Sequence, residues 1–143
     1  MKTLADIMIE GFVTSVGRHA TVAEACAAMG ESNAGIVAIE DDGHLVGLFS
    51  ERDVVRRVVN EGENPATTPV ENVMTTKIVV AAPTDDVESA VRKMDSANIR
   101  HLPVVEDGHL VSMLSIRDLM RVNLHERDEE IHYLYEYMYL VQH

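Results

Sequence analysis

The sequence has one cysteine, little positive charge and no long apolar run, and each scarcity excludes a class of protein. Cys26 is the only cysteine among 143 residues, so an intrachain disulfide framework is excluded. Its neighbours Ala25, Ala27 and Ala28 indicate small-residue core packing on a helix rather than a reactive thiol. No run approaches the roughly eighteen apolar residues that a membrane span requires, and no basic segment precedes an apolar stretch near Met1. We therefore expect a cytoplasmic protein with no membrane partner.

Acidic residues outnumber basic residues two to one. The chain has 24 acidic against 12 basic residues, a formal net charge of -12. Such a chain repels phosphate-rich polymers, and no Lys/Arg-rich run exists to build a basic face, so we expect no nucleic-acid partner. Any anionic ligand must be small. The 46% hydrophobic and 25% charged content is typical of a globular domain.

The dominant feature is an internal repeat. Residues 21–56 align with residues 86–121, 65 positions later and without a gap, and 13 of the 36 aligned pairs are identical. About 2 identities would be expected by chance. The copies agree best at 43–46 and 108–111, which both read Gly-His-Leu-Val, and both then reach Ser-x-Arg-Asp. Two copies of this length are too short to fold alone, so they should pack into one pseudosymmetric core with function in the clefts between them.

Each repeat predicts the order strand, helix, strand, strand, helix. Apolar residues at helical spacing predict helices from Val22 to Met29 and from Val87 to Met94. Thr21 and Asp86 stand at the N-cap positions, and only Thr21 has a Glu three residues later for a full capping box.

Asp-Gly pairs between apolar runs predict two hairpins. Their strands are expected at 36–39, 45–49, 102–105 and 110–114, with a further helix from 52 to about 60 and another from 117 onward. Val70 to Met74 echoes Leu4 to Met8. The predicted division is repeat 1 at 1–62, a linker at 63–69, repeat 2 at 70–124 and a C-terminal extension, expected to be helical, at 125–143.

The two copies, "VAEACAAMGESNAGIVAIEDDGHLVGLFSERDVV" and "VESAVRKMDSANIRHLPVVEDGHLVSMLSIRDLM", resemble a tandem pair of CBS domains, the regulatory unit called a Bateman module. The marks are the "LPVV-x-DG-x-LV" hairpin and the Ser-x-x-Asp-apolar ending, in duplicate and at equal spacing over nearly the whole chain. The resemblance implies an α/β (α+β) fold of two strand-helix-strand-strand-helix repeats in a stand-alone module. It also implies two clefts that bind adenosine nucleotides or related adenosyl compounds.

Asp53 and Asp118 are the first candidates for ligand contacts. A carboxylate has two acceptor oxygens and can accept hydrogen bonds from both hydroxyls of a ribose 2′,3′-diol. Ser50 and Ser115 lie three residues earlier, where a hydroxyl and nearby backbone amides could hold a phosphate. The alternative is that Ser and Asp simply cap a helix, and the two roles can coexist.

Arg100 and His101 distinguish the copies, because the equivalent positions of the first are Gly35 and Ile36. In similar modules, such as the gamma subunit of AMP-activated kinase, a basic pair here meets phosphate and shares a cleft with the Ser-x-x-Asp of the opposite repeat. The resemblance thus implies a competent cleft formed by Ser50, Arg52, Asp53, Ile78, Val79, Arg100 and His101. The second cleft, weaker or empty, would be formed by Ser115, Arg117, Asp118, Val13, Thr14, Gly35 and Ile36.

Two alternatives for these basic residues stay open. An exposed Arg-His pair is by default a solvated loop feature, and Arg52 and Arg117 could be helix-surface salt-bridge partners. If His101 does contact phosphate, it should be protonated above its usual pKa of about 6.5, and nucleotide binding should weaken as pH rises.

The tail from Val122 to His143 exceeds what the second repeat needs. An apolar helical stripe predicts a partner surface, and the nearest candidate is a second copy in a homodimer. The stripe consists of Leu124, Ile131, Leu134, Tyr135, Met138 and Val141. Alternating tyrosines from Tyr133 to Tyr139 would instead suit a strand. His125, Glu129 and His132 lack the compact His-x-x-x-His form, so we expect no metal site.

Catalysis is disfavoured, because the sequence has no Gly-rich phosphate loop with Lys-Ser/Thr and no nucleophile elbow. We expect a non-enzymatic sensor that needs no cofactor, binds AMP, ADP, ATP or NAD(H), changes its arrangement and regulates an unknown partner protein. S-adenosylmethionine shares the adenosine portion, but the basic pair favours a phosphate-bearing ligand. The alternative is a protein-interaction scaffold with vestigial clefts.

Overall fold

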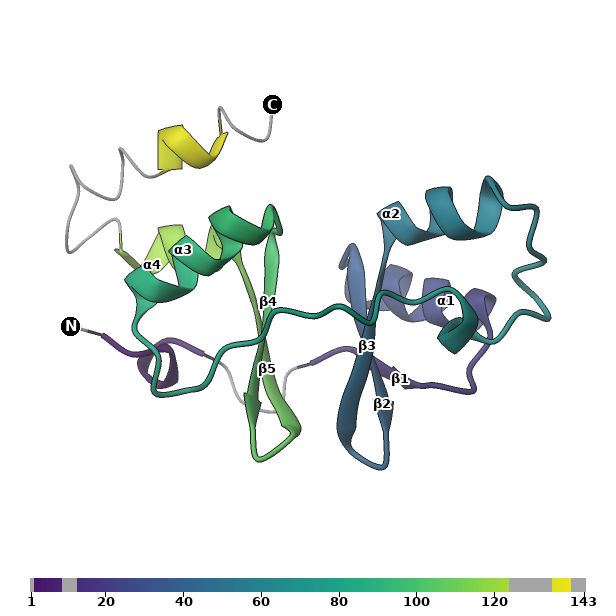
Figure 1. Cartoon of the computed structure of the whole chain (residues 1–143), viewed down its shortest axis with the longest axis horizontal. Helices are drawn as coiled ribbons and strands as arrows, with labels where there is room; N and C mark the ends of the chain where they lie inside the picture. The colour runs from purple at the N-terminus through teal and green to yellow at the C-terminus, as the bar shows by residue number, and fades with distance from the viewer. Residues whose placement is uncertain (1, 9–12, 124–134, 140–143) are drawn as a thin grey trace. The chain divides into compact units, whose positions relative to one another are not determined.

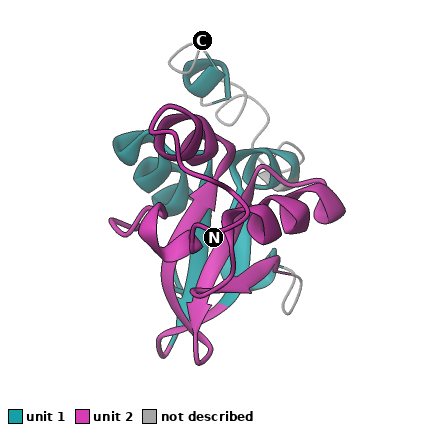
Figure 2. Ribbon diagram, turned by 90° about the vertical axis from the view of Figure 1, so that its right-hand side faces the viewer, with its two compact units in different colours: residues 1–11, 79–106, 111–143 teal, residues 12–78, 107–110 magenta. Residues whose placement is uncertain are grey.

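The computed structural model describes residues 2–8, 13–123 and 135–139. The chain is mixed α+β and divides into two compact units, coloured separately in Figure 2. Unit 1 consists of residues 1–11, 79–106 and 111–143, and unit 2 of residues 12–78 and 107–110.

The two units exchange the leading segments of the two sequence repeats. Val70 begins the second repeat in sequence, yet it is fully buried in the core of unit 2, beside Phe49 and Val22. Leu4, at the equivalent place in the first repeat, is fully buried in the core of unit 1. Backbone hydrogen bonds fix both segments, from Leu4 N to Asp85 O (2.8 Å) and from Val70 N to Ala20 O (2.7 Å). Each unit thus combines residues from both repeats.

Unit 2 contains three neighbouring strands in the order β1-β2-β3 (Figure 1). β1 (Ser15–Gly17) pairs parallel with β2 (Ile36–Asp41), which pairs antiparallel with β3 (His44–Ser50). The helix α1 (Val22–Ser32) packs its apolar face on this sheet, with Val22, Ala25 and Met29 buried. The half-buried Cys26 lies against the same core, and burial raises the pKa of its thiol, as expected of a packing residue.

Caps and turns form where the sequence predicts them. The Thr21 hydroxyl accepts from Glu24 N (3.1 Å) and Thr21 N donates to Glu24 Oε1 (3.3 Å), which completes the capping box. The turns Asp42-Gly43 and Asp107-Gly108 have positive φ at both residues, as a type I′ hairpin requires. The repeated Asn33 and Asn98 end their helices in the left-handed conformation, which asparagine tolerates.

The helix predicted from Arg52 to about Asn60 has an unexpected form. A short α2 (Glu51–Asp53) continues as the π-helix Val54–Val59, in which Asn60 N donates to Val55 O at 3.0 Å. The wider turn is held by long-range contacts that periodicity does not reveal: Val58 is buried, and Arg57 Nη1 donates to Met74 O at 2.8 Å. Val55 and Val59 are left exposed. The 3₁₀ helix Val70–Asn72 completes unit 2.

Unit 1 contains the 3₁₀ helix Leu4–Asp6, α3 (Val87–Ala97), the adjacent strands β4 (His101–Glu106) and β5 (His109–Ser115), and α4 (Ile116–Asn123). The Asp86 side chain caps α3 by accepting from Ser89 N at 2.7 Å. The unit 1 core gathers Met94, Leu102 and Leu119, and Met138 of the tail packs on it. Residues 135–139 are helical, with Tyr135, Tyr137 and Tyr139 exposed; the rest of the predicted apolar stripe lies outside the described residues.

The first strand of the second repeat is reduced to one bridge between Ala81 and Val104. Ala81 N donates to Pro103 O (2.9 Å) and Val105 N donates to Ala81 O (2.8 Å). Extending this parallel ladder would need backbone N–H donors at Pro103 on one side and at Pro83 on the other, and proline has none. The strand that the repeat order predicts at this place is therefore present as a single bridge, and the two prolines explain why it is no longer.

Residues 107–110, at the tip of the β4–β5 hairpin, group with unit 2. There the His109 and His44 rings lie 4.5 Å apart between centroids, and His109 Nδ1 lies 3.0 Å from Gly43 O. Both histidines are exposed, as the repeat predicts for turn residues.

Candidate functional site

The first Ser-x-x-Asp motif links the end of β3 to the start of α2. Ser50 N donates to Asp53 Oδ2 (3.0 Å), the Ser50 hydroxyl donates to the same oxygen (3.2 Å), and Asp53 N donates back to Ser50 Oγ (3.3 Å). The pair is therefore a capping box, and the capping role predicted for it is present.

Asp53 has further partners that the sequence did not reveal. The Thr75 hydroxyl lies 3.1 Å from Asp53 Oδ1 and 3.3 Å from Oδ2, close enough to donate to either. Arg57 Nε stands 3.6 Å from Oδ1. Asp53 is only 7% exposed, and protein groups lie beside both of its carboxylate oxygens. The contact with Thr75 spans 22 positions of the chain, and no local motif signals it.

The second Ser-x-x-Asp motif has the same cap but a different environment. Ser115 N donates to Asp118 Oδ2 (3.0 Å) and Asp118 N donates to Ser115 Oγ (3.1 Å). Asp118 is exposed. Within the described part of the chain, no hydrogen bond or ion pair reaches Asp118 Oδ1.

The basic pair lies beside the second motif. Arg100 is exposed, and its backbone oxygen accepts from Ile116 N at 2.9 Å. His101 is half-buried, and this burial lowers the pKa of its imidazole below the usual 6.5. The Asp118 carboxylate acts in the opposite direction and raises this pKa, whereas Arg100 lowers it. Asp118 is therefore the nearby charge that favours the protonated form of His101, although burial has the larger effect.

The first repeat has the same layout without the charges. Glu51 N donates to Gly35 O at 3.0 Å, and Ile36 pairs with Ser50 across β2 and β3. Ala38 N donates to Thr14 O at 3.0 Å, which fixes the segment before β1 against β2. The first Ser-x-x-Asp motif thus lies next to Gly35 and Ile36. The second lies next to Arg100 and His101.

The two predicted clefts each combine residues from both units, and these groupings stay predictions. Of the other candidates, Arg52 and Arg117 are exposed and form no ion pair with the described residues, so the predicted salt-bridge alternative is not observed there. Half-buried apolar or neutral candidates are Val13, Thr14, Gly35, Ile36, Ile78 and Val79.

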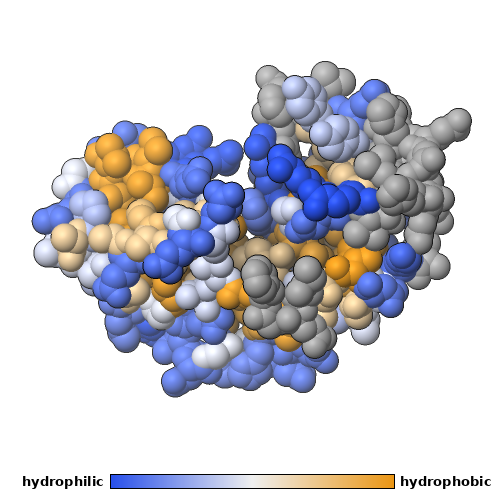
Figure 3. Space-filling view, turned by 180° about the vertical axis from the view of Figure 1, so that it is seen from behind, coloured by the Kyte–Doolittle hydropathy of each residue, from blue (hydrophilic) through white to orange (hydrophobic). Residues whose placement is uncertain are grey.

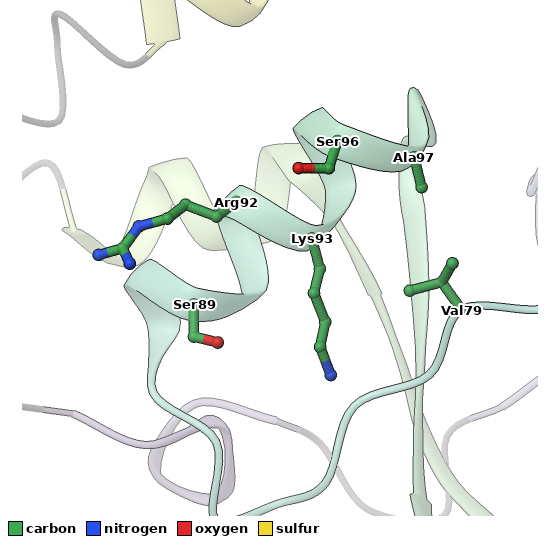
Figure 4. A pocket seen from close by; sticks show the side chains of 6 residues that line it. All are labelled: Val79, Ser89, Arg92, Lys93, Ser96 and Ala97. Atoms are coloured by element: carbon green, nitrogen blue, oxygen red, sulfur yellow. The ribbon is translucent and has the colours of Figure 1, made fainter.

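A groove on α3 was not predicted. Its volume is about 420 Å³, and among the predicted site residues it shares only Val79. Figure 4 shows the Lys93 side chain reaching down toward the segment of Val79 while Arg92 points away. Lys93 Nζ donates to Val80 O (2.9 Å) and lies 3.5 Å from Asp85 Oδ2, so its charge is already partnered. This groove could not be predicted from the sequence, because it depends on how α3 packs on residues 79–80.

No described helix is both long and apolar enough to cross a membrane. Within residues 2–8, 13–123 and 135–139, no group of three or more His, Cys, Asp or Glu side chains could hold a metal ion. His125, Glu129 and His132 lie outside the described residues.

Two repeats of like α+β construction, each ending its hairpin in a Ser-x-x-Asp cap, define the chain as a tandem module. The model of the family described as "CBS domain" matches residues 4–60 and 70–125. The chain therefore belongs to the CBS-domain family and carries two CBS domains.

Curated relatives agree with this assignment. The chain is 32% identical over 123 residues to "CBS domain-containing protein CBSX3, mitochondrial" of Arabidopsis thaliana, with 82% of this chain and 60% of that protein covered. It is 33% identical over 107 residues to "CBS domain-containing protein YhcV" of Bacillus subtilis, with 75% of this chain and 76% of that protein covered. The chain thus spans less than two thirds of the length of CBSX3.

Two similar solved structures contain adenosine compounds. CBSX2 in complex with AMP has a TM-score of 0.75 at 24% identity, covering 87% of this chain and 98% of that one. The CBS domain pair of MJ0100, in complex with 5′-methylthioadenosine and S-adenosyl-L-methionine, has a TM-score of 0.77 at 22% identity, covering 89% and 99%. At these identities the likeness shows the fold alone.

Proposed function

We propose that this chain is a non-enzymatic regulatory module that binds an adenosine nucleotide, among AMP, ADP, ATP and NAD(H), and regulates a partner protein through a change of its arrangement. The observation that carries this proposal is the combination in unit 1 of an open carboxylate oxygen on Asp118 with the cationic Arg100 and the titratable His101. The AMP complex of CBSX2 and the adenosyl complexes of the MJ0100 pair support the ligand class.

The chemistry of the two groups matches opposite ends of a nucleotide. A carboxylate oxygen accepts a ribose hydroxyl, and a guanidinium forms charge-assisted hydrogen bonds to a phosphate. The half-buried positions 78 and 79 would supply apolar surface for the adenine. We keep the residues of both predicted clefts as candidates, but here Arg100 and His101 are combined with Asp118 rather than with Asp53, because these three residues lie in the same unit.

A second copy of this chain is the proposed assembly partner. Val55 is 56% and Val59 is 66% exposed on the π-helix, and Figure 3 shows apolar side chains gathered on the exposed surface of that end of unit 2. The exposed Tyr135, Tyr137 and Tyr139 present a second surface of the kind that interfaces favour. The homodimer, the regulated protein and a cytoplasmic location are proposals. These apolar surfaces also favour the second candidate, a scaffold with vestigial clefts.

Thermal unfolding with AMP separates these two functions. A ligand at about 100 times its dissociation constant adds roughly 2.7 kcal/mol of stability, so millimolar AMP should raise the unfolding midpoint by several degrees. Removing the ribose 2′-hydroxyl in 2′-deoxy-AMP should abolish most of this shift. The midpoint shifts caused by ATP, NADH and S-adenosylmethionine at the same concentration would show which group attached to the adenosine gives the strongest binding. If no compound moves the midpoint, the scaffold replaces the sensor.

The pH dependence of AMP binding tests the role of His101. A bound phosphate should raise the pKa of His101, which burial lowers in the free protein, so binding would take up a proton. Between the free-state and bound-state pKa values the affinity should therefore fall as pH rises, by up to about tenfold per pH unit. Calorimetry between roughly pH 6 and pH 8.5 measures this slope.

The phosphate of AMP itself titrates near pH 6 and also contributes to the pH dependence of the affinity. Variants are therefore needed to isolate the contribution of His101. His101→Gln should bind AMP more weakly at pH 6 and lose the His101 part of the slope, whereas Arg100→Gln should weaken binding at every pH and keep the slope. An affinity that is unchanged over the range in the unmodified protein would exclude phosphate contact by His101.

A further inference from the structure

Two histidine rings face each other where the tips of the two hairpins meet. His44 of β3 pairs with His109 of β5, and their rings lie 4.5 Å apart between centroids at an interplanar angle of 37°. Both residues are exposed, and both belong to unit 2. Side chains directly opposite each other in an antiparallel pair share one face, so one ligand can reach both imidazoles.

The glycines of the two turns let the rings approach this closely. Each ring packs over the turn of the opposite hairpin: a Cβ built at Gly43 would stand 3.3 Å from His109 Nδ1, and one built at Gly108 would stand 3.0 Å from His44 Cδ2. Both glycines also have positive φ, at 79° and 80°, which other residues rarely adopt. This reciprocal packing holds both rings at the hairpin tips.

The hydrogen bonds of the rings decide which nitrogen is left for a ligand. His44 Nδ1 lies 3.2 Å from Asp42 O, and His109 Nδ1 lies 3.0 Å from Gly43 O. A carbonyl oxygen only accepts, so each Nδ1 has to carry the proton, and in the neutral ring the lone pair is then on Nε2. No hydrogen bond from a described residue reaches either Nε2. A metal-binding histidine has this arrangement, with its second nitrogen donating to a carbonyl.

Two carboxylates flank the histidine pair in sequence. Asp42 and Asp107 stand two residues before His44 and His109 in the two turns, and both are exposed. Neither forms an ion pair with a described residue. Together with the net charge of -12, they favour cations over anions at this surface. Two imidazole donors suit a transition-metal ion such as Zn²⁺ rather than Mg²⁺ or Ca²⁺, which prefer oxygen.

We propose that His44 and His109 bind Zn²⁺, or a similar imidazole-preferring divalent ion, through their Nε2 atoms. Two nitrogens at about 2.0–2.1 Å from one Zn²⁺ lie roughly 3.4 Å apart in a tetrahedral site, which suits rings whose centroids stand 4.5 Å apart. The described residues place no third His, Cys, Asp or Glu side chain with the pair, so water completes the coordination.

The metal would join the hairpin tip of the first repeat to that of the second, 65 positions later in the chain. Neither His44 nor His109 belongs to the two predicted nucleotide clefts. The metal site is therefore independent of the proposed function, and it would give the module a second kind of ligand.

Calorimetric titration of the full chain with ZnCl₂ tests the site. Wild type should bind a Zn²⁺ equivalent that His44→Gln and His109→Gln each weaken at least about tenfold, because losing a ligand should cost no less than losing the hydrogen bond that orients one. His19→Gln is the matched control, since the His19 side chain is 79% exposed in the same unit and lies outside the pair. This variant should keep the wild-type affinity, and excess Mg²⁺ should not compete.

The unfolding midpoint separates a metal site from a purely structural contact between the rings. Zn²⁺ at about 100 times its dissociation constant should raise the wild-type midpoint by several degrees and leave His44→Gln and His109→Gln almost unshifted. Without metal, both variants should stay within about 2 °C of wild type, as expected at exposed positions. If Zn²⁺ shifts the variants as much as wild type, the rings are a structural contact only.

NMR of the imidazole nitrogens in wild type identifies the donor atoms and needs no variant, so it holds even where a substitution impairs folding. Metal-free His44 and His109 should show the Nδ1–H tautomer, and Zn²⁺ should shift the Nε2 signals of both rings. Nε2 signals that Zn²⁺ leaves unchanged, or a His44→Gln or His109→Gln variant that binds Zn²⁺ as tightly as wild type, would overturn the assignment. The AMP titrations of the proposed function are read separately, because no nucleotide candidate is altered.

Discussion

Replacing Gly47 with valine should cost about 3 kcal/mol of unfolding free energy, close to the upper end for overpacked positions. Gly47 is buried in β3, and a Cβ built there would meet Met74 Sδ in a steric clash and Met74 Cγ at 2.9 Å. It would also stand 3.1 Å from the backbone oxygen of Thr75. The side chain of Met74 can shift, but the backbone at Thr75 is bonded to Leu48 on both sides. Valine should therefore push the segment from β3 and displace the hydroxyl that faces Asp53.

The matched control is Gly17→Val in β1. Gly17 also lies in a strand, but no atom stands within 4 Å of its Cβ position, so valine should change stability by less than about 0.5 kcal/mol. Urea unfolding of the two variants and wild type measures both free energies. Equal losses in the two variants would contradict a role for the close approach of Met74 and Thr75.

Replacing Leu4 with alanine should cost about 2–5 kcal/mol, although Leu4 lies only four residues into the chain. Its side chain is fully buried with Val87, Ala90 and Met94 in the core of unit 1, and the flanking backbone is bonded to Asp85. A cavity there has few ways to collapse, because the 3₁₀ helix Leu4–Asp6 is tied at both ends: Thr3 N donates to Asp6 Oδ2 at 2.9 Å and Ile7 N donates to Leu4 O at 3.1 Å. Urea unfolding again supplies the measurement.

Two valine-to-alanine substitutions, one buried and one exposed, serve as the control for Leu4→Ala. Val70→Ala, at the equivalent place in unit 2, should cost roughly 2 kcal/mol, because its side chain is fully buried. Val59→Ala makes the same chemical change at a site that is 66% exposed and should be nearly neutral. If Leu4→Ala were as neutral as Val59→Ala, the leading segment would not be part of the unit 1 core.

The parts of the fold that could be predicted from the sequence are those that short-range contacts determine. The capping box of Thr21 and Glu24 spans three residues, and the Asp-Gly turns need only two residues that accept positive φ. Even the short extent of the strand pairing at Ala81 was open to prediction, since Pro83 and Pro103 are visible in the sequence. The wide turn of Val54–Val59 was not, because it depends on the packing of Val58 and on the bond from Arg57 to Met74.

The candidate site divides in the same way. The Ser-x-x-Asp caps were predictable because Ser50 and Asp53 are three residues apart, as are Ser115 and Asp118. The different surroundings of Asp53 and Asp118 could not be predicted. Thr75 contacts Asp53 from a segment 22 positions away, and the sequence repeat assigns that segment to the other copy. The low pKa of His101 in the free protein also escaped prediction, because it follows from burial that the flanking sequence does not reveal.

The exchange of leading segments has a consequence for the order in which the chain can fold during synthesis. A ribosome delivers residues 12–78 as one continuous stretch, so almost all of unit 2 can form before α3 and the later helices and strands of the second repeat have emerged. Residues 1–8 have to wait, because the partners of Leu4 in α3, β4 and α4 are made roughly eighty to one hundred and fifteen residues later. Until then Leu4, Ile7 and Met8 remain as an apolar strip without a core, and the last unit to be completed is the one that begins the chain.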